Sequence, residues 1–236
     1  MYEKWPFSEA TDAGDAGRML STTPRTTLGR KKHRALTDRS ALHAVLDEGL
    51  ICQFGIVRDG VPLVLPTGYG RDGDTLYLHG STGAASLRTA AHGLDVCVTV
   101  TLLDGIVYSR SVNNHSMNYR SAVILGQAKP VLDAEAKMHG LKVLTDHLAP
   151  GSWTHAREVN TKEFAAVSVL ALDLAEASVK MRAEGPDDEP EDVEADTAWA
   201  GVLPVRTVFG APEPSEDLSP GWTTPPHVTA RAATAR

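Results

Sequence analysis

LICQFGIVRDGVPLVLPTGYGRDGDTLYLH, residues 50–79, contains three runs rich in β-branched, aromatic and other apolar residues. Two Asp-Gly pairs, at 59–60 and 72–73, separate the runs. An Asp-Gly pair between such runs is a strong hairpin signal, because both residues tolerate a positive φ. This stretch therefore predicts a meander of antiparallel strands.

Outside the meander, the chain alternates between helical patterns and further β-rich runs. The expected helices are 37–49, capped by Thr37 or Asp38 and closed by Gly49; 84–92; and 133–148, capped by Asp133. The expected strands are 94–103, which turns at Asp104 and Gly105; 118–131; and 164–174, which continues into EASVKMR. Six or seven antiparallel strands with three helices predict a mainly β fold, a closed or partly closed β-barrel with flanking helices.

The net charge of −7 comes mostly from one segment. Eight acidic residues and no basic ones lie in EGPDDEPEDVEAD, residues 184–196, so the other 22 acids nearly balance the 23 lysines and arginines. GRKKHR at 29–34 is interpreted as a solvated flank of the helix that follows, with phosphate contact as the alternative. We therefore expect no nucleic-acid partner.

Several other classes of protein lack support in the sequence. No apolar run approaches the ~20 residues that cross a bilayer, and MYEKWPFSEATDAG lacks the apolar segment of a signal peptide, so we expect a cytoplasmic protein. Cys52 and Cys97 lie in apolar runs without metal-ligand spacing, which indicates buried reduced thiols. His139 and His147 are too far apart on their helix for a tight metal pair, and no metal site is expected.

One nucleotide motif matches in letters only. GYGRDG, residues 68–73, satisfies GxGxxG, but a strand and not a helix follows it. The dinucleotide fingerprint needs its third glycine to open a helix whose N-terminus meets the pyrophosphate. There is no Walker sequence either, so neither a Rossmann domain nor a nucleotide hydrolase is expected.

Two segments carry polar groups where ligands bind. LYLHGSTG, residues 76–83, leads from a strand into a turn with backbone N–H groups and hydroxyls at the start of the 84–92 helix. Such a turn fits a phosphate, or else it is a capped connection without a ligand. In HSMNYRSAVILG, residues 115–126, the polar residues precede an apolar run and either bind a ligand at the sheet rim or satisfy strand-end backbone groups.

The order and spacing of six motifs resemble the flavin-nucleotide-binding branch of the pyridoxamine 5'-phosphate oxidase superfamily, which includes nitroimidazole-resistance proteins and haem-handling relatives. The motifs are LPTGY, LYLHGSTG, LLDGIVYSRS, HSMNYRSAVILG, EFAAVSVLALDLAEASVKMR and WAGVLP. The resemblance covers about residues 25–208. It implies an FMN-binding split barrel that forms a homodimer, with a flavin at each end of the interface.

The resemblance also implies a role for each matching position. Pro66, Thr67 and Tyr69 would lie beside the isoalloxazine ring, and His79, Gly80 and Ser81 would form the turn near the flavin tail and ring edge. Asn118, Tyr119 and Ser121 would line the pocket near the dimer interface. Lys180, Arg182 and Trp199 would approach the same site from across that interface.

One departure from the family pattern concerns the phosphate. Ala84 and Ala85 stand where many relatives carry a cation. Phosphate binding would then depend on Ser81, Thr82, Ser86 and backbone N–H groups, with help from Arg88. FMN is the expected cofactor, and haem or a deazaflavin is the alternative.

With these motifs in place, the chain divides into five expected segments. They are a weakly ordered lead-in (1–24), the split-barrel flavin-binding domain (25–183), an acidic loop (184–196), a segment that packs on the barrel or the partner (197–210), and a disordered tail (211–236).

Three functions follow from the resemblance. The first is an FMN-dependent oxidoreductase that reduces nitro compounds or another small electrophile, with a nicotinamide as a possible electron donor. The others are a haem-binding or haem-degrading protein on the same barrel and a flavin-binding module without turnover. His79 is the catalytic candidate, because it ends a strand beside the turn, although it could equally hydrogen-bond that turn. Pyridoxamine phosphate oxidation is not expected, because no basic cluster stands ready for the substrate phosphate.

Overall fold

A computed structural model describes residues 17–81 and 93–232. The predicted helix 84–92, and with it Thr82, Ser86 and Arg88, lies outside these residues. Ser81 is described in its backbone only. None of the helices in the described part of the chain is both long enough and apolar enough to cross a membrane.

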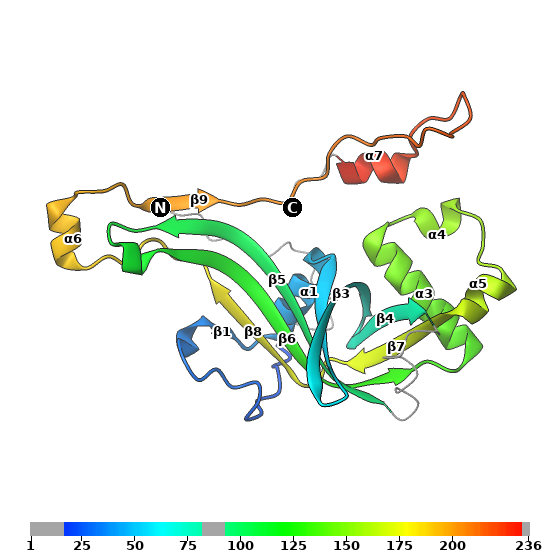
Figure 1. Cartoon of the computed structure of the whole chain (residues 1–236), viewed down its shortest axis with the longest axis horizontal. Coiled ribbons are helices and arrows are strands. Elements are labelled where there is room, and N and C mark those ends of the chain that lie inside the picture. The colour runs from blue at the N-terminus through cyan, green and yellow to red at the C-terminus, as the bar shows by residue number, and fades with distance from the viewer. Residues whose placement is uncertain (1–16, 82–92, 233–236) are drawn as a thin grey trace.

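The described residues form one antiparallel sheet of nine strands that closes partly on itself (Figure 1). The strands are β1 Ala35–Leu36, β2 Ile51–Arg58, β3 Val61–Asp72, β4 Thr75–Ser81, β5 Leu94–Tyr108, β6 Ser116–Pro130, β7 Val167–Asp173, β8 Ala177–Arg182 and β9 Gly201–Pro204. Their order is β1-β8-β6-β7-β4-β3-β2-β5-β9, and an additional pairing of β6 with β5 closes a ring. The predicted mainly β split barrel is confirmed, with more strands than expected.

The meander forms as predicted. Asp59 and Gly60, with φ of 53° and 78°, make the two-residue turn between β2 and β3. β2 pairs with β3 along its whole length, whereas β4 pairs with β3 only between Tyr69–Leu78 and Asp72–Thr75. On its other edge β4 pairs with β7 along its whole length, from Thr75 to Ser81. The barrel is therefore open between β3 and β4.

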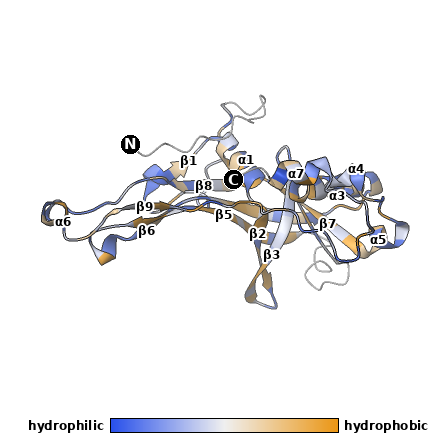
Figure 2. Ribbon diagram, turned by 90° about the horizontal axis from the view of Figure 1, so that it is seen from above, coloured by the Kyte–Doolittle hydropathy of each residue, from blue (hydrophilic) through white to orange (hydrophobic). Residues whose placement is uncertain are grey.

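The turn predicted at Asp104 and Gly105 is wrong. β5 continues through these residues to Tyr108, and a bulge between Leu103 and Gly105 absorbs them. Here β5 also pairs with β9, and a Cβ at position 105 would lie 3.0 Å from the Val202 side chain. The absence of a side chain at Gly105 thus allows β9 to approach β5 closely, and the chain does not reverse here. Together β5, β6 and β9 form a long arm that extends from the barrel (Figure 1), and the view from above shows the same arm (Figure 2).

Two helices of the described chain cover the barrel. In α1 (Arg39–Glu48), capped by Asp38 and followed by Gly49, the side chains of Leu42, Val45 and Leu46 are fully buried in the core. α3 (Ala134–Leu148) begins at the Asp133 cap as predicted and packs against β3. Their contact is close, because a Cβ at Gly70 would lie 2.7 Å from a backbone oxygen of α3.

The remaining helices are short and were not predicted. They are η1 Lys32–Arg34, η3 Val112–Asn114, α4 Ser152–His155, α5 Thr161–Ala166, α6 Pro190–Ala195 and α7 Pro226–Ala232. α5 replaces the first part of the strand predicted over 164–174, since Asn160 and Glu163 form a capping box that starts a helix there. α6 lies within the expected acidic loop, and α7 lies within the expected disordered tail.

Candidate functional site

The first group of predicted site residues flanks the opening between β3 and β4. Their ladder ends at the pair Tyr69–Leu78. Pro66 and Thr67 precede that pair on β3, and residues 79–81 follow it on β4, so in antiparallel strands both sets lie at the same end. The structure therefore brings these residues together at the barrel opening. We call Pro66, Thr67 and residues 79–81 the opening group.

His79 is exposed within the opening group. Its backbone pairs with Val169 of β7, and within the described residues its ring has no hydrogen-bond or ion-pair partner. β4 continues through His79 to Ser81, so the turn predicted at Gly80 and Ser81 is wrong. An exposed imidazole without a hydrogen-bond partner can bind a ligand or transfer a proton.

Tyr69 belongs to the core and not to the opening. Its side chain is 1% exposed, and its hydroxyl donates to the backbone oxygens of Leu46 at 2.6 Å and Gly49 at 2.9 Å. The ring also lies 4.8 Å from that of His147. The Tyr69 hydroxyl therefore links β3 to the C-terminal end of α1.

The second group lies where β6 and β8 meet. Asn118, Tyr119 and Ser121 are on β6, and the register pairs Tyr119 with Arg182 and Ser121 with Lys180. The Tyr119 and Ser121 side chains lie on the outer face of the sheet, because Arg120 and Ala122, which alternate with them, point into the core. By the same alternation Asn118 shares the face of Arg120. These residues of β6 and β8 form the β6–β8 group.

Arg182, Asn118 and Ser121 of the β6–β8 group already have partners, and the Ser121 hydroxyl donates to the Lys180 backbone oxygen at 3.4 Å. The Arg182 guanidinium donates to the Asn118 side chain and to the backbone oxygens of Glu184 at 3.0 Å and Gly185 at 2.8 Å. Burial lowers the pKa of Arg182, although the nearby Glu184 opposes the shift. Arg182 and Asn118 thus hold the chain as it leaves β8. Within the described chain the Tyr119 hydroxyl and the Lys180 ammonium group make no hydrogen bond or ion pair, although Tyr119 lies close enough to Arg182 to interact with its charge.

Arg120, between Asn118 and Ser121 in the sequence, points inward. It is 4% exposed and donates to Glu48 at the end of α1 and to Asp104 in the bulge of β5, the latter at 2.7 and 3.0 Å. These two carboxylates raise the pKa of Arg120 despite its burial. The ion-pair triad joins α1, β5 and β6 and leaves the outer face to the flanking residues.

Trp199 lies further along the arm, just before β9. Its ring centroid is 5.8 Å from that of Tyr108, which in turn lies 5.7 Å from the His115 ring. Trp199 is 69% exposed. Arg110 anchors the acidic segment beside this cluster through Asp188, at 3.0 Å, and Asp196, at 2.9 Å. The cluster therefore offers exposed aromatic surface at the end of the arm.

A strip of polar residues connects the opening group with the β6–β8 group, and the sequence interpretation did not identify it. Pro66 pairs with Gln53 of β2, Gln53 pairs with Thr99 of β5, and Thr101 pairs with Ser121. Three strand spacings of about 4.8 Å put the two groups roughly 14 Å apart across the sheet. The signal was available in VCVTVT, where valines alternate with polar residues and place the threonines on the outer face.

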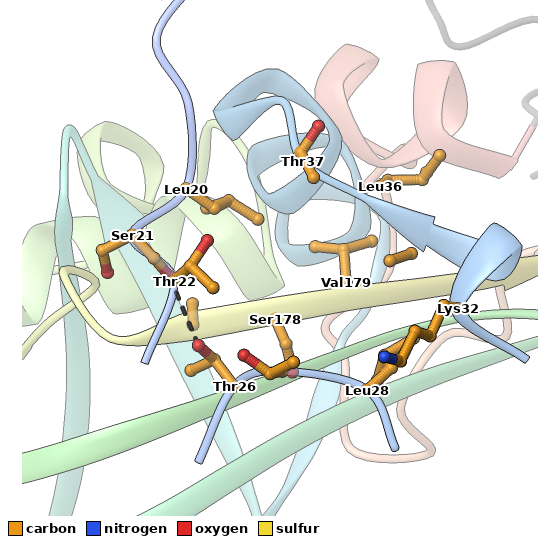
Figure 3. A pocket seen from close by; sticks show the side chains of 13 residues that line it. Leu20, Ser21, Thr22, Thr26, Leu28, Lys32, Leu36, Thr37, Ser178 and Val179 are labelled. Carbon is orange, nitrogen blue, oxygen red and sulfur yellow. Dashed lines mark hydrogen bonds between the residues drawn. The ribbon is translucent and has the colours of Figure 1, made fainter. Parts of the chain in front are cut away.

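A small cavity lies elsewhere, between the N-terminal segment and β8 (Figure 3). Its volume is about 160 Å³. None of the predicted site residues lines it; hydroxyls of Thr22, Thr37 and Ser178 and the stem of Lys32 surround an apolar floor. Pockets for cofactor-sized ligands usually begin at about 300 Å³. This cavity is therefore too small for a flavin.

Several histidines of the described chain have hydrogen-bond partners within the protein. His43 contacts Asp74 at 3.1 Å, His139 contacts Asp72 at 2.8 Å, and His147 contacts the Gly49 oxygen at 2.7 Å. Within the described residues no three His, Cys, Asp or Glu side chains gather in a way that could hold a metal ion.

Comparison with known proteins identifies the family of the fold. A family model described as pyridoxamine 5'-phosphate oxidase matches residues 38–181. The flavocytochrome Anf3 from Azotobacter vinelandii is 37% identical with a TM-score of 0.83, over 89% of this chain and 97% of that one. A FAD- and haem-binding protein from Mycobacterium smegmatis is 40% identical with a TM-score of 0.80, over 84% and 97%.

A more distant structure shares the fold alone. A putative 5-nitroimidazole antibiotic resistance protein from Bacteroides thetaiotaomicron is 24% identical, with a TM-score of 0.54, over 62% of this chain and 85% of that one. No curated protein sequence matches the chain.

Proposed function

We propose that this chain, which belongs to the pyridoxamine 5'-phosphate oxidase family, is a flavin-binding redox protein whose cofactor lies on the outer face between the opening group and the β6–β8 group. The observation that carries the proposal is the similarity, over more than four fifths of the chain, to two proteins whose names include a flavocytochrome and a FAD- and haem-binding protein. The polar strip between the two groups agrees with it.

The residues of this face fit a flavin. A flavin ring presents a polar edge of carbonyl oxygens and nitrogens and a flat apolar surface. Thr101, Tyr119 and Lys180 offer hydroxyl and ammonium donors that make no side-chain hydrogen bond or ion pair in the described chain. Ile51 and Leu103, 57% and 42% exposed on the same face, offer apolar contact. This donor set beside exposed aliphatic surface is what a planar heteroaromatic ring requires.

When bound, a flavin supplies one- and two-electron transfer, and the protein contributes orientation, ring electrostatics and exclusion of water. In this chain Lys180 would place positive charge near the polar ring edge, Thr101 and Ser121 would hydrogen-bond it, and His79 would hold or move a proton at the opening. FMN is our first choice of flavin and FAD the second. A nicotinamide is the proposed electron donor and a small electrophile, such as a nitro compound, the proposed acceptor.

We further propose that two chains form a dimer through this face. Leu103, Met117 and Leu203, 42%, 51% and 54% exposed, give the arm an apolar surface that a second copy would cover. Residues of the partner arm would then complete the cofactor site at the barrel opening. Sedimentation of the full chain should give a dimer, and Met117→Asp should give a monomer that retains less flavin. Val193→Asp, a change at an exposed valine on α6, is the matched control.

Cofactor reconstitution tests the flavin proposal directly. The purified chain, stripped of cofactor, is titrated with FMN and with FAD separately while the flavin fluorescence is recorded. We expect saturable binding of at least one flavin, weakened by Lys180→Ala and Thr101→Val and unchanged by Thr27→Val in the N-terminal segment. Failure of both flavins to bind would refute the proposal.

Haem is the second candidate cofactor, favoured by the two similar structures whose names mention a cytochrome or haem. His79 would hold the haem iron through its imidazole, because its exposed ring at the barrel opening makes no hydrogen bond or ion pair in the described chain. Haem titration of the stripped protein should produce a Soret band that His79→Ala removes and His33→Ala preserves. A Soret band unaffected by His79→Ala would exclude this ligand.

A further inference from the structure

Two histidines far apart in the sequence face each other at the C-terminal helix. His155 ends α4 and His227 lies in α7, and their ring centroids are 5.0 Å apart with an angle of 60° between the ring planes. α7 follows a long extended segment and lies beside the corner between α3 and α4 (Figure 1). Neither histidine belongs to the opening group or to the β6–β8 group.

The local backbone makes room for the pair. Gly151, with φ of 82°, caps α4, and a Cβ at this position would lie 2.8 Å from the His227 Cβ. Any other residue would therefore force α7 away from α4, in addition to straining the backbone. One helical turn after His227, the Arg231 guanidinium lies 4.6 Å from the centroid of the Phe209 ring. These contacts fix where His227 stands relative to His155.

The distance between the rings matches that of two imidazoles on one metal ion. A metal–nitrogen bond of about 2.0–2.1 Å puts each ring centroid about 3.2 Å from the metal. At a tetrahedral angle the two centroids are then about 5.2 Å apart, and at a right angle about 4.5 Å. The observed 5.0 Å falls between these values.

Both rings are available for such a bond. Neither ring has a recorded hydrogen bond or ion pair in the described part of the chain, unlike His43, His139 and His147. His155 is exposed and His227 half-buried, so an ion can reach both. Because no cluster of three potential ligands exists in the described residues, water would complete the coordination shell.

We propose that His155 and His227 bind one divalent ion of the late first-row metals, the class that prefers imidazole and includes Zn²⁺, Ni²⁺ and Cu²⁺. The ion would join α7 to α4 and so fasten the C-terminal segment to the barrel. Imidazole binds metals in its neutral form, so acidification weakens the site.

Calorimetric titration of the untagged full chain with Zn²⁺ tests the proposal. We expect one ion per chain, and both His155→Ala and His227→Ala should weaken binding by at least the roughly 10–100-fold that changes in the surroundings of metal ligands cause. His115→Ala, at an exposed histidine at the other end of the molecule, is the control and should bind as the parent does. Equal binding by all four proteins, or no binding by the parent, would overturn the proposal.

A second measurement separates ligation from folding. Gly151→Ala keeps both imidazoles but displaces His227, and should also weaken Zn²⁺ binding. In the parent, Zn²⁺ should slow hydrogen exchange in 226–232 and leave that of β2 unchanged, and His155→Ala should abolish the slowing. If Zn²⁺ binds but does not slow hydrogen exchange in α7, the ion does not join α7 to α4. Neither measurement depends on flavin or haem.

Discussion

Replacing Tyr69 by Phe distinguishes a structural role from a cofactor role at one position. The resemblance to the family implies that Tyr69 lies beside the flavin ring, whereas the structure buries it with its hydroxyl on the backbone of Leu46 and Gly49. The substitution keeps the ring and removes only the hydroxyl. The result therefore reports on those hydrogen bonds and not on packing.

The expected loss follows from the contacts of that hydroxyl. A net hydrogen bond contributes about 0.5–1.5 kcal/mol, and a buried carbonyl that loses its donor costs about 1–3 kcal/mol. Gly49 keeps a contact with His147 at 2.7 Å, so the Leu46 oxygen is the group most affected. We expect the free energy of unfolding to fall by about 2 kcal/mol, which lowers Tm by about 4–8 °C for a protein of this size.

Urea unfolding of the cofactor-free protein, followed by circular dichroism, measures this loss. Tyr77→Phe is the matched control, because no hydrogen-bond partner of its hydroxyl is recorded in the described chain, and we expect a change within about 0.5 kcal/mol. Flavin affinity should be the same in parent and Tyr69→Phe. Unchanged stability together with weakened flavin binding would show that Tyr69 acts on the cofactor and that the reasoning is wrong.

Three further predictions concern packing and titration. Gly70→Ala should lower the free energy of unfolding by about 1–3 kcal/mol, because its Cβ would lie 2.7 Å from the backbone of α3. Gly68→Ala is the control, because a Cβ there meets nothing within 4 Å, and thermal melts of the two variants should differ accordingly. Hydrogen bonding from Arg157 and the capping backbone lowers the pKa of Glu163 from 4.5 to about 2. The stability that parent gains over Glu163→Gln should therefore be complete above pH 4.5 and vanish as the pH falls towards 2, and a pH-independent difference would contradict this. Burial raises the pKa of the Cys52 thiol to about 12, so alkylation of the native protein, followed by mass spectrometry, should modify the chain's other cysteine first.

Local signals predicted local structure well. Asp59 and Gly60 make the expected hairpin turn, and Asp133 starts the expected helix, because each signal acts through backbone groups within a few residues. The bulge at Asp104 could not be predicted in this way. An Asp-Gly pair also suits a bulge, and only the pairing with β9, about a hundred residues later, decides between bulge and turn.

The candidate site shows the same limit. Motif order identified residues on both sides of the barrel opening, but not the orientation of each side chain. Tyr69 is three residues after the outer-facing Pro66, so its side chain points to the opposite face, into the core. The Arg182 side chain is hydrogen-bonded to the backbone that follows β8. The outer-facing threonines of β5 were missed because they belong to no motif, although their alternation with valines was visible.

The opening between β3 and β4 also leaves a strand edge exposed. Residues 61–68 of β3 pair with β2 on one side and with no strand of the described chain on the other. A free edge of this kind can template the addition of a strand from another molecule and so begin aggregation. Pro62 and Pro66 stand on this strand, and since both lack an N–H donor, they interrupt the ladder that such a strand would need. The same gap that gives access to the proposed cofactor face is thereby protected from unwanted growth of the sheet.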